Sequence, residues 1–239
     1  MLFGWFWGDW TVIVLIPGIL LTLWAQIQVK SSYARYEREL LAPHMTGAAV
    51  ARRILDGNGL SDVPVEMVEG YLSDHYDPRS RVLRLSAEVY MGNNVAAVGV
   101  AAHEAGHAMQ HAKGYLPLHF RTVLVPVCNI GSHLAMPLFL IGMLLAGGSV
   151  FSEWLMMAGI LAFSLSVFFQ LVTLPVEFNA SRRAMRCLTN SGTMTEEQLK
   201  GSRRVLSAAA MTYVAALAAG LLSLLRLLLL AGRFSRRSR

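Results

Sequence analysis

The sequence is 239 residues long, 54% hydrophobic and only 15% charged, and its mean hydropathy is +0.46. This composition is too apolar for an ordinary soluble domain and indicates an integral membrane protein. The formal net charge of +6 does not indicate nucleic-acid binding, because the arginines flank apolar segments, as expected for membrane topology and anionic lipid headgroups. The two cysteines, Cys128 and Cys187, exclude a disulfide framework and a cysteine-rich metal site.

The chain begins with an apolar segment that is long enough to cross a bilayer. The aromatic cluster MLFGWFWGD leads into an apolar run from Trp10 to Val29, and a helix of about 20 residues spans the hydrocarbon core. A cleaved signal peptide is the alternative, but the run is too long for one, Asp9 replaces the usual positive charge, and no A-x-A site follows. We therefore predict a retained N-terminal anchor at residues 1–30.

Residues 31–121 have the composition of a small polar module. Thr46 is a suitable N-cap for a helix whose apolar stripe ends at Gly57. Residues 63–68 and 82–85 then predict two short strands around the polar turn DHYDPRS. A small α+β module is the expected result.

The second of these strands is a predicted substrate contact. A free sheet edge can hold an extended peptide through main-chain hydrogen bonds. We expect residues 82–86 to form such an edge, with Leu83 and Leu85 as candidate substrate-binding residues.

The stretch from Val95 to Ala112 predicts a helix that carries the sequence HEAGH. Its two histidines, His103 and His107, lie one turn apart on one face, about 6 Å along the axis, where both imidazoles can bind one zinc ion. Glu104 is then placed to take a proton from zinc-bound water without being a ligand. The flanking residues suit helix ends: Asn93 or Asn94 before it and Gly114 after it.

Three further apolar runs predict three more membrane crossings. Residues 122–146 and 154–176 form a helical hairpin, and Pro126 and Pro137 predict kinks in its first helix. A Thr195 to Gln198 capping box precedes a last long helix, whose residues 208–230 form the fourth crossing.

Basic residues on the flanks of these runs predict the topology. Those after the first and third crossings are Lys30, Arg35, Arg38, Arg182, Arg183 and Arg186. The positive-inside rule therefore places the HEAGH helix and the segment after the hairpin in the cytoplasm. The basic tail at residues 233–239 conflicts with this rule, because a fourth crossing puts it on the outer side.

A zinc hydrolase needs a third protein ligand and an open fourth position. His111 continues the four-residue spacing, but it lies about 12 Å along the axis from His103, too far for one ion. Glu177 follows an even number of crossings after His107 and so emerges on the same side of the membrane. We expect a helix beginning near Glu177 to supply the third ligand; the alternative is an interfacial glutamate that ends a membrane helix.

The same helix would bring small residues to the HEAGH helix. Ala180 and Ser181 follow Glu177 by one turn, where they can pack closely against Gly106. The other ionisable candidates lack a matching spacing or side of the membrane: His44, His75, His119 and Glu153. His133 lies inside the second crossing, where it either serves a function or hydrogen-bonds between helices.

Several motifs together resemble the YugP-type zinc-dependent membrane peptidase family: HEAGHAMQH, DHYDPRSRVLRLS, TLPVEFNASRRA and AMTYVAA. More distantly, H-E-x-x-H followed by E-x-x-A is similar to the HtpX-type and CAAX prenyl protease group of membrane gluzincins. The resemblance implies zinc ligands at His103, His107 and Glu177, a general base at Glu104, and a bacterial plasma membrane location. The wider group usually has Asp where this chain has Ser181, so we expect support for a zinc histidine to come from elsewhere.

The expected fold is a mainly α integral membrane protein with about four transmembrane helices and a small zincin-like α+β catalytic module. Its expected segments are an anchor (1–30), the catalytic module (31–121), a membrane hairpin (122–176), a third-ligand and connecting segment (177–207), and a C-terminal crossing with its basic tail (208–239).

The expected function is zinc metalloendopeptidase activity with one Zn²⁺, acting on a peptide or a membrane protein in the bilayer. Candidates for a transition-state donor or substrate contact are His75, Tyr76 and Tyr213. Two alternatives stay open. An integral membrane metal-binding or transport protein would use His133 and Asn129, and a silent adaptor would need no zinc.

Overall fold

The computed structural model describes residues 9–70, 73–145 and 149–237. The aromatic cluster ahead of Asp9 lies outside these ranges. The chain forms two compact units. A helical unit consists of the described parts of Met1–Trp24, Phe120–Thr173 and Tyr213–Arg239, and a mixed unit consists of those of Ala25–His119 and Leu174–Thr212.

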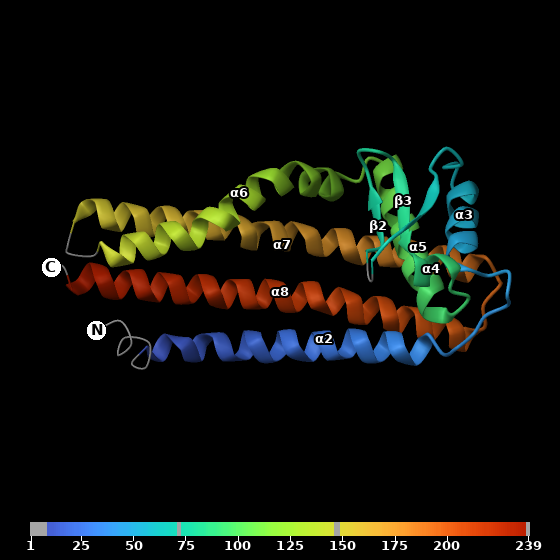
Figure 1. Ribbon diagram of the computed structural model, residues 1–239, viewed down its shortest axis with the longest axis horizontal. Helices are drawn as coiled ribbons and strands as arrows, with labels where there is room; N and C mark the ends of the chain where they lie inside the picture. Colours follow the sequence, from blue (N-terminus) through green and yellow to red (C-terminus); the bar gives the residue numbers. More distant parts are fainter. Residues whose placement is uncertain (1–8, 71–72, 146–148, 238–239) are drawn as a thin grey trace. The chain divides into compact units, whose positions relative to one another are not determined.

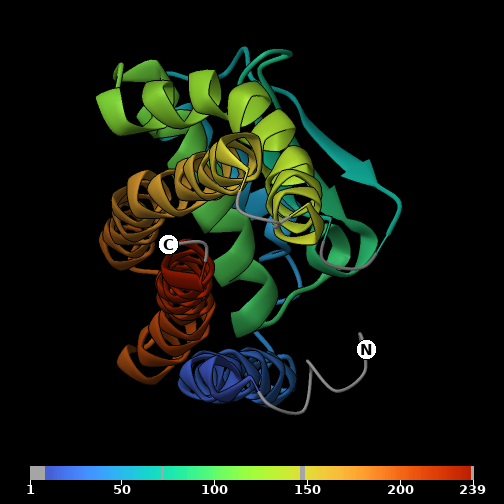
Figure 2. The same ribbon diagram turned by 90° about the vertical axis from the view of Figure 1, so that its left-hand side faces the viewer.

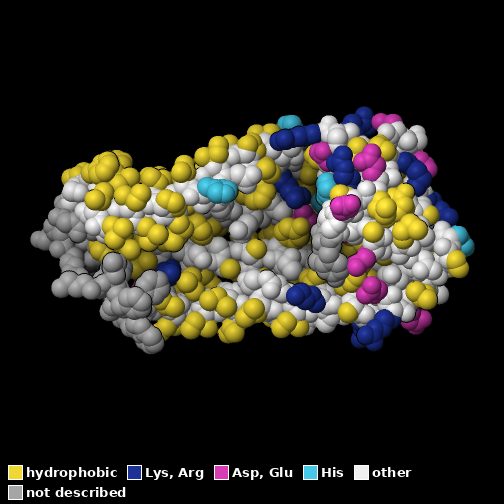
Figure 3. All heavy atoms as spheres, in the orientation of Figure 1, with side chains coloured by type: hydrophobic (Ala, Val, Ile, Leu, Met, Phe, Trp, Pro, Cys, Tyr) yellow, Lys and Arg dark blue, Asp and Glu magenta, His cyan; other side chains and the backbone are white. Residues whose placement is uncertain are grey.

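Long apolar helices account for most of the chain, as expected for a mainly α membrane protein. They are the 3₁₀ helix η1 (Trp10–Leu15) with α2 (Ile16–Tyr36), α6 (Leu116–Leu144), α7 (Val150–Asn190) and α8 (Glu196–Arg237). Among the described residues, these give four stretches long and apolar enough to cross a membrane. In the helical unit, α6, α7 and α8 pack together (Figure 2), and Phe139 of α6 contacts Ile160 of α7 and Leu227 of α8. Hydrophobic side chains cover much of the surface of this unit (Figure 3).

The helical unit also joins the first and last helices through an ion pair. Asp9 Oδ2 lies 2.9 Å from Arg226 Nη2, and Asp9 Oδ1 lies 3.5 Å from Arg233 Nη1. Thr11, which is fully buried, contacts both sides, because its hydroxyl donates to Asp9 and lies 3.4 Å from Arg226 Nε. One carboxylate therefore pairs with Arg226 and with Arg233, the first arginine of the basic tail that conflicts with the positive-inside rule.

The mixed unit packs a small sheet with short helices around α5 (Figure 1). Its elements are α3 (Gly47–Gly57), β1 (Val65–Val68), β2 (His75–Asp77), β3 (Val82–Ser86), α4 (Ala87–Met91) and α5 (Val95–Ala112). Thr46 caps α3 by accepting from Ala49 N, and Asn94 caps α5 by accepting from Ala97 N. The predicted caps and the predicted Val95–Ala112 helix are therefore confirmed.

The sheet order corrects the sequence prediction. The order is β1-β3-β2, with β1 parallel and β2 antiparallel to β3. The prediction that residues 82–86 form a free edge is therefore wrong, because β3 is the central strand. The third strand, β2, lies within the segment DHYDPRS, which we predicted to be a turn. This strand was not predicted because its sequence is short and polar and lacks an alternation of apolar residues.

The helix α7 also differs from the expectation. It runs without interruption from Val150 to Asn190, so Glu177 lies inside a 41-residue helix instead of near the start of a new one. Pro175 lies within this helix and did not end it, since a proline in a long membrane helix loses only a local backbone bond. The capping box before α8 is confirmed: Thr195 N donates to Gln198 Oε1 at 2.9 Å, and Gln198 N donates to Thr195 Oγ1 at 3.2 Å.

Candidate functional site

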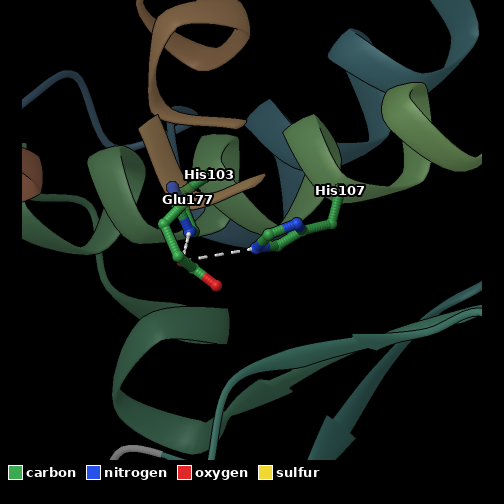
Figure 4. Close-up of side chains that lie close together, drawn as sticks. All are labelled: His103, His107 and Glu177. Atoms are coloured by element: carbon green, nitrogen blue, oxygen red, sulfur yellow. Dashed lines mark hydrogen bonds and ion pairs between the residues drawn. The ribbon is translucent and has the colours of Figure 1, made fainter. Parts of the chain in front are cut away.

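Two helices of the mixed unit bring His103, His107 and Glu177 together (Figure 4). Glu177 Oε2 of α7 lies 3.2 Å from His103 Nε2 and 3.7 Å from His107 Nε2 of α5. The two imidazole rings stand edge to face, with their centroids 4.8 Å apart. Three potential ligand atoms therefore converge on one point, and all lie within 4.8 Å of one another.

The chemistry and spacing of these three groups fit a zinc ion. Two imidazoles and one carboxylate are a ligand set of catalytic zinc sites, which keep a fourth position open. Donors about 2.1 Å from a tetrahedral ion lie roughly 3.4 Å apart, and the two nitrogen to oxygen distances of 3.2 and 3.7 Å bracket this value. These two imidazoles and one carboxylate could therefore hold a zinc ion.

Each histidine is held through its other ring nitrogen. His103 Nδ1 lies 3.1 Å from Ser181 Oγ, and His107 Nδ1 lies 3.0 Å from Gln110 Oε1. Such contacts orient a ligating imidazole and select its tautomer. Support for His103 therefore comes from position 181 itself, where we expected none, because a serine hydroxyl reaches the ring in place of the aspartate usual in the wider group.

The orientation of the Gln110 amide follows from its neighbours. Gln110 Nε2 donates to Val176 O at 2.8 Å and to Asn179 Oδ1 at 3.1 Å. Asn179 Oδ1 also accepts from Arg183 Nε at 2.7 Å. A guanidinium can only donate and a backbone carbonyl can only accept. The oxygen and nitrogen positions of the Asn179 and Gln110 side-chain amides are therefore both determined. Oε1 must face His107, whose Nδ1 then carries the proton and whose Nε2 keeps its lone pair for a metal.

Glu104 lies beside this centre on α5 and is held by the backbone of β2. Its side chain is buried, and Tyr76 N donates to Glu104 Oε2 at 3.1 Å. Burial raises the pKa of the Glu104 carboxyl to about 7, and the nearby carboxylates of Glu177 and Asp74 add to the rise while His103 opposes it. A carboxyl with this pKa can accept and return a proton near neutral pH.

Close packing between α5 and α7 sets the distance between the ligands. A Cβ atom added to Gly106 would lie 2.6 Å from the carbonyl oxygen of Ala180, which is fully buried. The absence of a side chain at Gly106 therefore lets the two backbones approach. This confirms the expectation for Ala180, which packs against Gly106.

The predicted substrate residues have different fates. Leu83 and Leu85 are fully buried in the central strand, so the prediction that they contact substrate is wrong. Tyr76 lies on β2 next to Glu104. His75 is exposed on the same strand, with Nδ1 2.7 Å from Ser73 O. Tyr213 belongs to the helical unit, and its role stays a prediction.

The remaining histidine candidates make other contacts. His111 Nδ1 lies 2.8 Å from the hydroxyl of Tyr76, the residue whose amide donates to Glu104. His133 is exposed in the helical unit, with Nδ1 2.6 Å from Asn129 O one turn earlier on the same helix.

Sequence reasoning missed three residues that shape the centre: Gln110, Asn179 and Asp74. Gln110 follows His107 by three residues and so shares its helix face, which was a usable signal. Asp74 accepts bonds from Ser86 N and Oγ and so fixes the entry to β2. Its partner, Ser86, is the last residue of β3, and no local pattern predicts that pairing.

Comparisons with known proteins show which proteins this chain resembles. A family model described as "Putative neutral zinc metallopeptidase" matches residues 11–232. The "Putative membrane protease YugP" of Bacillus subtilis (strain 168) is 49% identical over 219 residues, which cover 92% of this chain and 95% of that protein. The comparison with solved structures found no match. Since the family model covers most of the chain and the relative matches along most of both lengths, the chain belongs to this family of neutral zinc metallopeptidases.

Proposed function

We propose that this membrane protein is a zinc endopeptidase of the gluzincin type, with His103, His107 and Glu177 as the ligands of one Zn²⁺. The observation that carries the proposal is the convergence of these three groups within 4.8 Å next to the buried Glu104 carboxyl. A structural zinc site would be closed by four protein ligands. Three ligands beside a potential general base favour catalysis instead.

In this proposal Glu104 is the general base. Zinc, when bound, supplies a Lewis acid that activates water and polarises the scissile carbonyl. Glu104 receives the proton of the attacking water and returns it to the leaving amine. The Tyr76 amide holds Glu104 Oε2 in place, and Gln110 and Ser181 hold the imidazoles of His107 and His103.

The substrate peptide is proposed to lie along β2, the strand that replaces β3 as the candidate edge. Within the described residues, β2 pairs with β3 on one side only. The Tyr76 amide donates to Glu104, so it points away from β3. The outer edge of β2 therefore faces the candidate base. The Tyr76 amide on this edge is bonded to Glu104, so an extended peptide would donate a main-chain hydrogen bond to the Tyr76 carbonyl oxygen. His75 and Tyr76 remain candidates for the transition-state donor.

The active site is proposed to face the cytoplasm of a bacterium, with a peptide or a membrane protein as substrate. The basic residues after the first and third crossings support this orientation. The pairing of Asp9 with Arg226 and Arg233 also supports this orientation. The carboxylate compensates two positive charges in the C-terminal part of α8, which this orientation places toward the outer side.

The test is Glu104→Gln in the purified full-length protein. The variant should keep near-stoichiometric zinc, because its ligands are intact, and should lose peptide hydrolysis by several orders of magnitude, because the base is removed. Zinc is measured by mass spectrometry and hydrolysis with a quenched-fluorescence peptide mixture. A loss of less than tenfold, or about 1.4 kcal/mol, would contradict the proposed mechanism.

A further inference from the structure

A pocket of about 250 Å³ lies beside Tyr76 in the mixed unit. Its apolar wall consists of Leu60, Val63 and Ala108, all of them buried. Its polar side consists of Tyr76, Arg81 and His111. The volume is below the range of about 300 to 1,000 Å³ that accommodates drug-sized ligands, so the pocket suits one large side chain better than a free small molecule.

The pocket adjoins the candidate active site through two elements. Ala108 directly follows the metal-ligand candidate His107 on α5. Tyr76 borders both places, because its amide donates to Glu104 Oε2 at 3.1 Å while its side chain lines the pocket. On α5, Ala108 lies four residues after Glu104, about 6 Å along the axis. This offset equals roughly two residues of an extended peptide, at about 3.3 Å each.

The polar side chains that line the pocket already have partners. Arg81 Nη2 pairs with Asp62 Oδ2 at 2.9 Å, which compensates the positive charge. The Tyr76 hydroxyl lies 2.8 Å from His111 Nδ1, and burial raises the pKa of the Tyr76 phenol, so it stays uncharged at neutral pH. A charged ligand would have to compete with these pairs, whereas an apolar group gains contact with the buried wall.

Arg81, which lines the pocket, ends the turn between β2 and β3 in a left-handed backbone conformation. Its φ angle is +56°, and Arg81 is the one residue other than glycine with a positive φ angle in the described part of the chain. A left-handed backbone conformation costs free energy at a residue other than glycine, and residues in such conformations are frequent at ligand sites.

We propose that this pocket receives a large apolar side chain of the peptide substrate and so determines the cleavage preference. The proposal rests on the proposed peptidase function, because it assigns the peptide on β2 as the ligand. A peptide lying along β2 would pass Glu104 and place a side chain over Ala108 and the Tyr76 ring. Leu, Met and Phe are the preferred occupants.

The test measures peptide binding without cleavage. Fluorescently labelled nonapeptides with a central Phe, Ala, Asp or Lys between Ala and Ser residues are titrated against zinc-loaded Glu104→Gln protein, and binding is followed by anisotropy. The Phe peptide should bind at least tenfold more tightly than the other three. Equal affinities, or a preference for Asp or Lys, would overturn the proposal.

Two further substitutions on the same background link the preference to the pocket. Ala112 is exposed and lines the pocket, so Ala112→Phe should fill it and reduce the preference for Phe to less than twofold. Ala87 is an exposed alanine on α4 that does not line the pocket, and Ala87→Phe should keep the full preference. Both variants are checked for unchanged zinc content. A Phe preference that survives Ala112→Phe would place the subsite elsewhere.

A separate arm tests the function on which the proposal rests. Zinc-loaded protein with Glu104 intact is incubated with the same peptides, and products are identified by mass spectrometry. Cleavage near the central Phe supports both ideas. A Phe preference in binding that is lost in Ala112→Phe, without cleavage of any peptide, supports the pocket and contradicts the peptidase. Cleavage without a Phe preference supports the peptidase and contradicts the pocket.

Discussion

Gln110 Oε1 lies 3.0 Å from His107 Nδ1, and the Gln110 side chain is fully buried. Its amide nitrogen is fixed by the Val176 carbonyl on α7, so the same side chain joins the two helices that carry the candidate ligands. The contact therefore both selects the tautomer of His107 and sets the direction of its ring.

Substitution of Gln110 should weaken zinc binding. In Gln110→Ala the His107 ring loses its acceptor, and partners of this kind typically contribute about 10- to 100-fold to metal affinity. Zinc affinity is measured by competition with a chelator of known affinity. Lys113→Ala, an exposed change just after α5, is the control. A zinc affinity within twofold of wild type in Gln110→Ala would show that the contact does not support the metal.

Glu177 and His111 should differ in their effect on metal content. Glu177→Ala removes one of three proposed ligands, so the protein should purify largely without zinc and without activity. His111→Ala should keep its zinc, because His111 contacts the Tyr76 hydroxyl and lies about 12 Å along the axis from His103. Zinc is counted by mass spectrometry in both proteins. Full occupancy in Glu177→Ala with an empty site in His111→Ala would reverse the ligand assignment.

Two glycines of α5 offer a matched test of helix packing. An added Cβ at Gly106 would meet the Ala180 carbonyl oxygen at 2.6 Å, whereas at Gly99 the nearest atom is Ser202 Cβ at 3.4 Å. Gly106→Ala should destabilise the protein by about 1–3 kcal/mol through overpacking and weaken zinc binding. Gly99→Ala should be neutral or stabilise by up to about 1 kcal/mol through helix propensity. Thermal unfolding in detergent compares them, and equal shifts would contradict the proposed close approach.

Ser80 and Ser149 should report opposite sides of the membrane. Both are exposed, Ser80 in the turn between β2 and β3 and Ser149 between α6 and α7. In a background that lacks Cys128 and Cys187, an impermeant thiol reagent added to intact cells should label Ser149→Cys but not Ser80→Cys. The reverse pattern would place the active site outside the cell. Labelling of both after permeabilisation shows that the two cysteines are reactive.

Asp9 should stabilise the helical unit through Arg226. Asp9→Asn leaves a guanidinium that is 24% exposed without its carboxylate, which should cost about 1–3 kcal/mol. Arg226→Leu in the same background should recover part of the loss, because the unpaired charge is gone. The thermal midpoints of the single and double variants in detergent decide this. If the double variant is less stable than Asp9→Asn alone, Arg226 contributes independently of Asp9.

The sequence by itself determined the class of the protein and the relative placement of three residues of the candidate site. Long apolar runs can only satisfy their backbone in a bilayer as helices, so the crossings were predictable. His103, Glu104 and His107 belong to one helix, and the period of an α-helix places them without any knowledge of the rest of the fold. The caps at Thr46, Asn94 and Thr195 were local for the same reason.

Only the tertiary structure decided which strand borders the site and how the third ligand arrives. The residues of β3 alone suggested an edge strand, but the position of β3 in the sheet depends on its pairing with β1 and β2. Such pairings depend on contacts between different strands and not on the sequence of one strand. Likewise, Gln110 Nε2 donates to the Val176 carbonyl and to Asn179 because α5 packs against α7. Hydrogen bonds and close contacts between distant segments carry no local periodicity, and so no sequence pattern reveals them.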